Sequence, residues 1–430
     1  MTTLDEAPSA AFEEQIVKAN AEPNKARDVE KTGWEESAQE IDSAQVPVDI
    51  PDGGWWAWST LAGAYVNAYG VYQDFFVRSF LSNYSSSSIS WIGSIATFFL
   101  LAGGAVSGRL FDRGYFYFLL VGGSVLIVLC LFMLSLAEPQ HYYQIFLTLG
   151  LGLGLGTGAT YVPSLTIIAH HFSRRRALAM GIAASGASLG ALLHPIMLNN
   201  LFHGPVGFAN GVRASAGLMA GALILAGLLM RTRLPPRKGA QMGLFMSART
   251  FVKDEVYTIA VVATFLFVQG VFFPLFYIQL YSDEHGINSV FGFYSLTILN
   301  FASFVGRIVG GALVNRLGAF NVIVACTFAS SVLLFSLLGV STIAGITVFS
   351  LLYGFTSGAY ITLVAPMVAS LSADVSEMGA RIGVMYFFTG LGSLIGTPIT
   401  GALLTRDFVW WRPIVYTGAS ADWRSRWIAC

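Results

Sequence analysis

Residues 89–114 read ISWIGSIATFFLLAGGAVSGRLFDRG, an uncharged stretch of twenty residues followed at once by two arginines and an aspartate. A hydrocarbon core about 30 Å thick is crossed by roughly 20 mostly apolar residues in a helix. The uncharged stretch therefore predicts a membrane-spanning helix. The charged turn after it marks the place where the chain leaves the membrane.

Runs of the same kind recur along the whole chain. Eleven apolar runs of spanning length lie between residues 55 and 404, and the longest polar connection leaves six before it and five after it. Only 11% of the residues are charged and 55% are hydrophobic, whereas about a quarter of the residues of soluble proteins are charged. This pattern predicts an all-α, multi-pass membrane protein embedded in a lipid bilayer. No basic face with interleaved aromatic residues indicates a nucleic acid as a partner.

The charges and the apolar runs together predict four parts. They are an acidic, disordered cytoplasmic tail at 1–50, an N-terminal helix bundle at 51–230, a cytoplasmic linker at 231–255 and a C-terminal helix bundle at 256–430. The tail holds 12 acidic and 4 basic residues, so its net charge is near −8 and that of the rest is near +8. A polar segment of this composition cannot bury enough apolar surface to fold alone.

The second half repeats the first at an offset of 203 residues. The matching pairs are Pro163 with Pro366, Pro195 with Pro398, and Arg113 with Arg316. Two homologous six-helix halves are the interpretation that this offset favours. The counterpart of the sixth run falls at 414–433, where residues 416–420 resemble a helix start before the polar residues Asp422, Arg424 and Arg426. We therefore expect helix 12 to be incomplete.

The loops differ in their content of lysine and arginine, which sets the orientation of a membrane protein. Thirteen such residues lie on one side of the predicted spans and four on the other. We expect the richer side, and with it the N-terminus, to be cytoplasmic, in the cell membrane. Asn83-Tyr84-Ser85 then lies outside and forms a glycosylation sequon at Asn83.

Several motifs together resemble the monocarboxylate-transporter-like branch of the major facilitator superfamily, in its fungal form. They are Pro51-Asp52-Gly53-Gly54-Trp55, the turn at 108–114, the stretch 172–186, Phe276-Tyr277-Ile278-Gln279, Gly306-Arg307 and Arg381-Ile382-Gly383. The resemblance implies a major facilitator fold of two six-helix bundles, alternating access, and proton-coupled or facilitated movement of small organic solutes. It implies no cofactor.

Two positions depart from the lactate carriers of that family. Those carriers place a lysine near the outer end of helix 1, where this chain has Phe75, and an aspartate four residues before the helix-8 arginine, where it has Ser303. The first difference argues against simple monocarboxylates as substrates. The second removes the family's ion-pair partner of Arg307.

Arg307 lies inside an apolar run, and a cation in hydrocarbon costs roughly 2.5 kcal/mol or more unless it faces a cavity or a partner. Its guanidinium can bind an anionic or carbonyl-bearing solute with two hydrogen bonds. The alternative is a structural bond to a backbone carbonyl or to a serine such as Ser303. The further candidates for substrate binding are Phe75, Asn300, Tyr277 and Gln279.

Two residues are candidates for proton coupling, and three for gating. Asp74 carries a proton if burial raises its pKa, although pairing with Arg78 at i, i+4 is the simpler interpretation. His194 lies near the outer mouth, either as a pH sensor or, more simply, as a polar interface residue. Asp112 and Arg113 resemble the superfamily's gating motif, and Arg316 belongs to its second copy, where Asn315 replaces the acid.

These observations predict a secondary or facilitated transporter of a small organic metabolite, with efflux of a secondary metabolite ahead of other roles. The alternatives are proton-coupled uptake of a monocarboxylate or vitamin-like nutrient, and a non-transporting membrane sensor. No set of metal ligands and no grouping of nucleophile, base and orienting residue predicts an enzyme. The alternating glycines of 150–158 follow no strand, so they indicate close helix packing rather than a dinucleotide loop.

Overall fold

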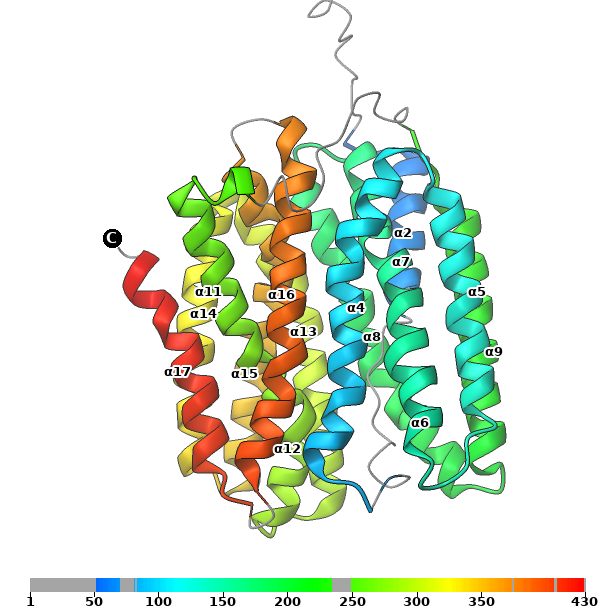
Figure 1. Cartoon of the computed structure of the whole chain (residues 1–430), viewed down its shortest axis with the longest axis vertical. Coiled ribbons are helices and arrows are strands. Elements are labelled where there is room, and N and C mark those ends of the chain that lie inside the picture. Colours follow the sequence, from blue (N-terminus) through cyan, green and yellow to red (C-terminus); the bar gives the residue numbers. More distant parts are fainter. Residues whose placement is uncertain are drawn as a thin grey trace, which may run out of the picture. The chain divides into compact units, whose positions relative to one another are not determined.

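A computed structural model describes residues 52–69, 81, 83–233, 249–372, 375–405 and 408–428 of the chain. Within these ranges the regular structure is helical, as expected (Figure 1). The described residues belong to one unit, Pro51–Cys430. The predicted N-terminal tail, most of the predicted linker, and the candidates Asp74 and Phe75 with the neighbouring Arg78 lie outside the described residues.

The first half of this unit contains the following helices in chain order: α2 (Trp55–Tyr69), α4 (Ser86–Asp112), α5 (Phe116–Leu134), α6 (Tyr142–Ile145), η1 (Phe146–Gly152), α7 (Leu153–Thr166), η2 (Ile167–His170), α8 (Arg176–His203) and α9 (Gly207–Leu229). The segment η1 is a π-helix and η2 a 3₁₀-helix. They continue α6 and α7 into one membrane-spanning segment.

The second half contains the following helices: α11 (Glu255–Val271), α12 (Phe273–Glu284), α13 (Ser289–Leu317), α14 (Ala319–Ser336), η3 (Leu337–Gly339), α15 (Ile343–Ser370), α16 (Val375–Leu404) and α17 (Trp411–Ile428). Ten helical segments among the described residues are long and apolar enough to cross a membrane. They coincide with ten of the eleven predicted runs, and only part of the first run, 55–77, is described.

Helix α17 occupies the place of helix 12. It begins at Trp411, three residues before the expected position, and extends over 18 residues. Its polar residues keep it outside the ten apolar segments. The apolar character of helix 12 is therefore interrupted by polar residues, as predicted, although its backbone is helical from Trp411 to Ile428.

The seventh membrane segment is broken. Helix α11 ends at Val271 and α12 begins at Phe273, with Pro274 in the first turn of α12. Proline has no backbone N–H and clashes with the preceding turn, so it starts a helix more readily than it continues one. The sequence analysis did not predict this break.

The glycines of 150–158 let the fourth segment pack closely against two neighbours. Residues two apart on a helix point to nearly opposite faces, since each residue turns the helix by about 100°. A Cβ atom at Gly154 would lie 2.9 Å from Ala96 Cα of α4, and one at Gly156 would lie 2.7 Å from Ile127 Cγ1 of α5. The prediction of close helix packing is confirmed.

Two helix pairs join the first half to the second. Helix α4 packs along α16, and α8 packs along α13 (Figure 1). Small residues let these backbones approach: a Cβ at Gly390 of α16 would lie 3.1 Å from the Ala102 nitrogen of α4. We call these two pairs the seams. Residues between the seams are placed to contact both halves.

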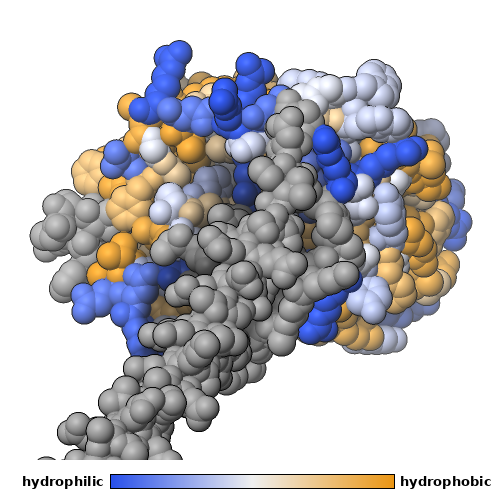
Figure 2. All heavy atoms as spheres, turned by 90° about the horizontal axis from the view of Figure 1, so that it is seen from above, coloured by the Kyte–Doolittle hydropathy of each residue, from blue (hydrophilic) through white to orange (hydrophobic). Residues whose placement is uncertain are grey.

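Arginine-rich turns lie at the end of the molecule where α4 and α13 finish and α8 begins. Hydrophilic side chains gather over this end, with apolar side chains around its flank (Figure 2). We call it the basic end. Its described basic residues are Arg109, Arg113, Arg174, Arg175, Arg176, Arg231, Arg233, Arg249, Lys253, Arg316 and Arg381.

Candidate functional site

Arg307 lies in α13 at the seam with α8, and only 9% of its surface is exposed. Its Nη1 atom donates a hydrogen bond of 3.1 Å to the backbone carbonyl of Ala184 in α8. Its Nε atom is buried and has no hydrogen-bond partner among the described residues. The alternative predicted from the sequence, a structural hydrogen bond from Arg307 to a backbone carbonyl, is therefore present. That bond involves Nη1, so the buried Nε–H can still donate to a second group.

Two glycines allow the backbones of α8 and α13 to meet beside Arg307. A Cβ atom at Gly181 would lie 2.6 Å from the Arg307 carbonyl oxygen, and one at Gly311 would lie 2.7 Å from the Ala177 carbonyl oxygen. Such distances are too short for a real side chain. The seam between the two halves at Arg307 therefore depends on residues without a side chain.

Three tyrosines from three other helices lie around the guanidinium. Tyr161 of α7 faces Arg307 closely enough to interact with it. Tyr386 of α16 lies within electrostatic range of both Tyr161 and Tyr360 of α15. Tyr386 also packs against a core cluster of each half. The four side chains thus form one polar and aromatic group between the halves.

These four residues share one depth. They lie 9, 10, 10 and 11 residues from the basic ends of their helical segments, which are His170, Leu317, Ser370 and Val375. A rise of 1.5 Å per residue places them about 15 Å from that end. This is half of a hydrocarbon core about 30 Å thick, so the group lies near the membrane midplane.

The Ser303 side chain occupies the position where the lactate carriers have an aspartate. Its Oγ accepts a hydrogen bond of 3.1 Å from Ser188 Oγ of α8, across the seam. No described carboxylate lies within ion-pair distance of Arg307. Asn300, one turn further, donates a 3.0 Å hydrogen bond to the Leu296 carbonyl in its own helix.

Tyr277 lies at the other seam, toward the end opposite the basic end. Its hydroxyl lies 2.7 Å from Ser90 Oγ in the second turn of α4, and a Cβ at Gly401 of α16 would meet the same hydroxyl at 2.6 Å. The structure therefore places Tyr277 at the α4–α16 seam rather than beside Arg307. Gln279 is half-buried in the same helix, α12.

His194 lies in α8 with none of its surface exposed. Its Nδ1–H donates to the Gly190 carbonyl, 3.2 Å away in the same helix. Complete burial of the side chain argues against the simpler interpretation as a polar interface residue, and a role in proton coupling stays a prediction. The other candidates for proton coupling and for the lysine position, Asp74 and Phe75, lie outside the described residues.

The gating candidates form the turns that close α4 and α13. Asp112 is the last residue of α4 and is half-buried, and Arg113 is exposed and donates its backbone N–H to the Arg109 carbonyl at 3.1 Å. Gly114 follows with a φ of 92°, a conformation that glycine adopts without strain. Arg316 is exposed in the last turn of α13, and Gly318 repeats the positive φ.

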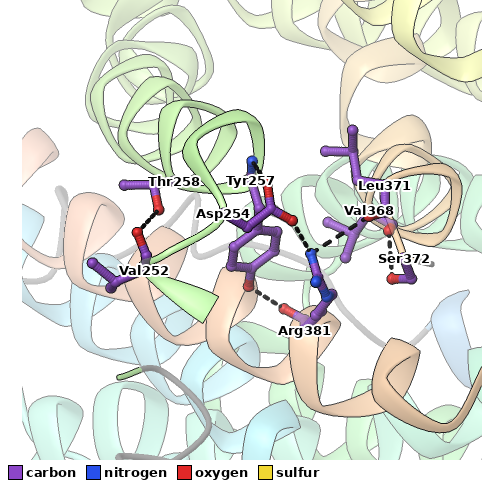
Figure 3. A network of polar contacts seen from close by, with 8 residues as sticks. All are labelled: Val252, Asp254, Tyr257, Thr258, Val368, Leu371, Ser372 and Arg381. Carbon is purple, nitrogen blue, oxygen red and sulfur yellow. Dashed lines mark hydrogen bonds and ion pairs between the residues drawn. The ribbon is translucent and has the colours of Figure 1, made fainter. Parts of the chain in front are cut away.

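An ion pair fastens α11 to α16 at the basic end (Figure 3). Arg381 Nη1 lies 2.6 Å from Asp254 Oδ2 and 3.4 Å from the Leu371 carbonyl, and its guanidinium stacks over Phe251. Tyr257 donates its hydroxyl proton to the Arg381 carbonyl at 2.6 Å. The hydrogen bond from Arg381 lowers the pKa of Asp254, the residue that caps α11.

Asp52 makes a comparable connection in the first half. Its Oδ1 accepts hydrogen bonds from the backbone N–H groups of Ser173, at 2.6 Å, and Arg175, at 3.4 Å. Desolvation raises the pKa of Asp52, but the backbone hydrogen bonds from residues 173–175 outweigh it and lower the pKa. Each half therefore has an acidic residue before its first helix that binds the start of its fifth helix.

Asn83 is exposed in the turn before α4, at the end opposite the basic end. Its backbone N–H donates to Gln140 Oε1 at 3.3 Å. Among the described residues no three His, Cys, Asp or Glu side chains gather in a way that could hold a metal ion.

A sequence model of the Major Facilitator Superfamily matches residues 54–352, more than half of the chain. The chain belongs to the Major Facilitator Superfamily. It is 37% identical to the aspyridones efflux protein apdF of Emericella nidulans over 87% of this chain and 77% of that protein. It is 37% identical to the agnestins efflux protein AgnL12 of Paecilomyces divaricatus, over 79% and 77%.

Among solved structures, the E. coli fucose:proton symporter FucP has the same fold. The two chains superpose with a TM-score of 0.64 at 16% sequence identity, over 87% of this chain and 97% of FucP. A likeness at this identity supports the arrangement of helices alone. The predicted major facilitator fold is confirmed.

As a member of the Major Facilitator Superfamily, the chain is a membrane transporter rather than an enzyme, and it moves a small solute. The sequence analysis found Arg307 but missed the tyrosines around it. Tyr161, Tyr360 and Tyr386 are 146, 53 and 79 positions from Arg307 along the chain. No pattern in the sequence distinguishes them from other tyrosines in apolar runs.

The connections that Asp52 and Asp254 make at the basic end of this transporter were also not predicted from the sequence. Asp254 falls within the predicted linker 231–255, and Arg381 was recognised only as part of the motif Arg381-Ile382-Gly383. A helix N-cap position, directly before the apolar run that starts at Glu255, was the signal that could have identified Asp254.

Proposed function

We propose that this transporter exports a small organic metabolite from the cytoplasm across the cell membrane by alternating access. The names of relatives that are 37% identical to it support this direction, since two of them are efflux proteins for the named products aspyridones and agnestins. The motifs around Asp52, Arg113 and Arg381 support placing it in the monocarboxylate-transporter-like branch.

The observation that carries the proposal is Arg307, a guanidinium buried at the midplane between the two halves with a donor that no described residue satisfies. A buried polar group without a partner is costly, so it is retained where a ligand completes it. Arg307 therefore binds an anionic or carbonyl-bearing group of the solute. Asn300, on the same helix, is the nearest of the other candidates along the chain, and Phe75 and Gln279 are further candidates, whereas Tyr277 lies at the α4–α16 seam.

The basic end faces the cytoplasm, together with the N-terminus, because lysine and arginine favour the inner side. The residues before 51 then form a cytoplasmic tail, and 231–255 links the bundles 51–230 and 256–430 on the same side. Asn83 faces outward on an exposed turn, where it is accessible for glycosylation.

Transport proceeds by rocking of the two bundles about the seams, so that the Arg307 group opens to one side at a time. Asp112, Arg113 and Arg316, at the matching turns of the two halves, act on the cytoplasmic gate. Asp74 and His194 are the candidates for coupling to a proton.

The test is flux into inside-out vesicles from cells that express the protein, supplied with the producing organism's metabolite extract and analysed by mass spectrometry. Export predicts that at least one metabolite accumulates in a saturable manner in the wild type. Arg307→Ala abolishes this accumulation while the amount of protein in the membrane is unchanged.

Arg213→Ala is the matched control, because Arg213 contacts Ser135 and Asn210 at the opposite end of the molecule. It should transport like the wild type. Accumulation only in right-side-out vesicles would support uptake instead. Absence of flux in both orientations, with ligand binding retained, would support a sensor.

A further inference from the structure

Tyr386 differs from the buried tyrosines elsewhere in this transporter in how its hydroxyl is used. Elsewhere the fold binds each hydroxyl itself: Tyr281 donates to the Leu337 carbonyl at 2.6 Å and Tyr353 to the Val271 carbonyl at 2.9 Å. By contrast, no described residue forms a hydrogen bond with the hydroxyl of Tyr386. The ring of Tyr386 packs against both halves, while its hydroxyl is not used by the described part of the fold.

The phenol of Tyr161 lies beside a guanidinium that has a buried donor without a described partner. Arg307 uses Nη1 for the Ala184 carbonyl and keeps its buried Nε unsatisfied. A guanidinium edge binds two neighbouring oxygens of one anion best. The hydroxyl of Tyr161, which faces the same guanidinium, can donate to one of those oxygens.

Aromatic rings also gather around the guanidinium. Tyr360 lies against Phe267 of α11, with 4.1 Å between the ring centroids, and Tyr386 lies near Tyr360. Rings prefer to pack against other rings, in offset or edge-to-face arrangements. An acid of two or three aliphatic carbons would reach the guanidinium without covering the phenols from three helices.

We infer that Arg307, Tyr161, Tyr360 and Tyr386 form one site for a planar conjugated acid, in which two neighbouring oxygens share a negative charge next to a ring. The inference rests on the proposed function and adds the chemical class of the solute. Arg307 binds the charge, Tyr161 and Tyr386 donate hydrogen bonds to the oxygens, and the rings of Tyr360 and Tyr386 contact the conjugated face.

Binding to the purified, detergent-solubilised transporter tests this class without any need for the natural solute. The probes are 2,4-dihydroxybenzoate, which is planar and conjugated, and cyclohexanecarboxylate, which has a similar size and the same charge but a puckered ring. We expect 2,4-dihydroxybenzoate to bind at least about tenfold more tightly, as measured by the ligand-dependent rise in Tm.

Single hydroxyl deletions then locate the site. Tyr386→Phe removes one hydrogen bond to the carboxylate and should raise the Kd of both acids about fivefold, because both present the same two oxygens. Tyr353→Phe is the control on α15: it removes a hydroxyl that the fold uses, so it should lower Tm and leave the Kd unchanged.

Equal Kd values for the two acids, or no binding of 2,4-dihydroxybenzoate, would overturn the inferred class. So would a Kd that Tyr386→Phe leaves unchanged. The proposed export is judged separately, by the flux of extract metabolites and its loss in Arg307→Ala. Saturable export together with equal Kd values would therefore reject a planar conjugated acid as the solute class, while the proposed export would still be supported.

Discussion

At the scale of single residues, Arg307 is a charge in the membrane that has no carboxylate partner among the described residues. The position that holds an aspartate in the lactate carriers it resembles is Ser303, and that serine is bonded to Ser188 across the seam. The guanidinium is anchored by one backbone carbonyl. The positive charge is therefore available for a negative charge that arrives with the solute.

Restoring the aspartate tests this account. In Ser303→Asp the new carboxylate lies four residues before Arg307 on the same helix, where opposite charges pair. We expect it to occupy the guanidinium and raise the Kd of 2,4-dihydroxybenzoate about tenfold or more, since a charge-assisted hydrogen bond contributes about 1.5–3 kcal/mol. The measurement is the ligand-dependent shift of Tm.

Ser303→Ala is the matched variant, because it also removes the bond to Ser188 but adds no charge. It should bind the probe within about threefold of the wild type. Equally tight binding by Ser303→Asp would mean that the anion does not contact Arg307.

At the scale of helices, the seam between α8 and α13 depends on glycine. A Cβ at Gly181 would lie 2.6 Å from the Arg307 carbonyl oxygen, which is backbone and cannot swing away. Gly181→Ala should therefore separate the helices and lower the free energy of unfolding by about 1–3 kcal/mol. The measurement is Tm in detergent.

Gly221→Ala in α9 is the control, because nothing lies within 4 Å of a Cβ at that position. Alanine favours a helix over glycine, so this variant should be as stable as the wild type or slightly more stable. A Tm for Gly181→Ala that equals that of Gly221→Ala would contradict the packing described for this seam.

The connection between α11 and α16 predicts a dependence on pH. Because the pKa of Asp254 is lowered below its ordinary value of 3.8 in the folded protein, the ionised carboxylate stabilises the fold. This stabilisation is complete above the unfolded pKa and is lost as the pH falls through the folded pKa. Asp254 is a third exposed, so we expect a contribution on the order of 1 kcal/mol.

Asp254→Asn should accordingly have a lower Tm than the wild type at pH 7 and pH 5, by the same amount at both. The difference should begin to shrink as the pH falls below 3.8, where the unfolded chain becomes protonated, and should vanish through the lower pKa of the folded protein. A difference that persists unchanged at pH 3 would show that the charge of Asp254 is not what fastens α11 to α16.

The helices themselves could be predicted from apolar runs, because spanning a bilayer requires a length and a composition that are visible locally. The break at Phe272 was missed because Pro274 lies inside an otherwise uninterrupted run. The helix at 411–428 was predicted only in part, since its polar residues hide it from a criterion based on hydropathy.

The candidate site could be predicted only for Arg307. A charge within an apolar run is unusual enough to be recognised locally, whereas Tyr161 and Tyr386 become significant through the helices that bring them to it. Tyr277 belonged to a recognisable motif, yet the fold uses it at the α4–α16 seam. A charged residue in an apolar run can be recognised in the sequence, whereas the residues around it are determined by how the helices pack.

At the scale of the whole molecule, the two seams and the group between them describe a transporter in which the halves rock about a midplane site. The central claim is that the group of Arg307 and the three tyrosines opens to each side of the membrane in turn. Tyr386 is the residue to label, since it is partly exposed and packs against both halves. The native Cys130 and Cys326 are buried and are replaced by alanine beforehand, as is Cys430.

The most direct measurement is the reaction of Tyr386→Cys with a membrane-impermeant methanethiosulfonate reagent, in right-side-out and in inside-out vesicles. The account predicts that the thiol reacts from both sides and that 2,4-dihydroxybenzoate slows the reaction from each. Reaction from one side only under all conditions, or no reaction from either side, would contradict alternating access at this site.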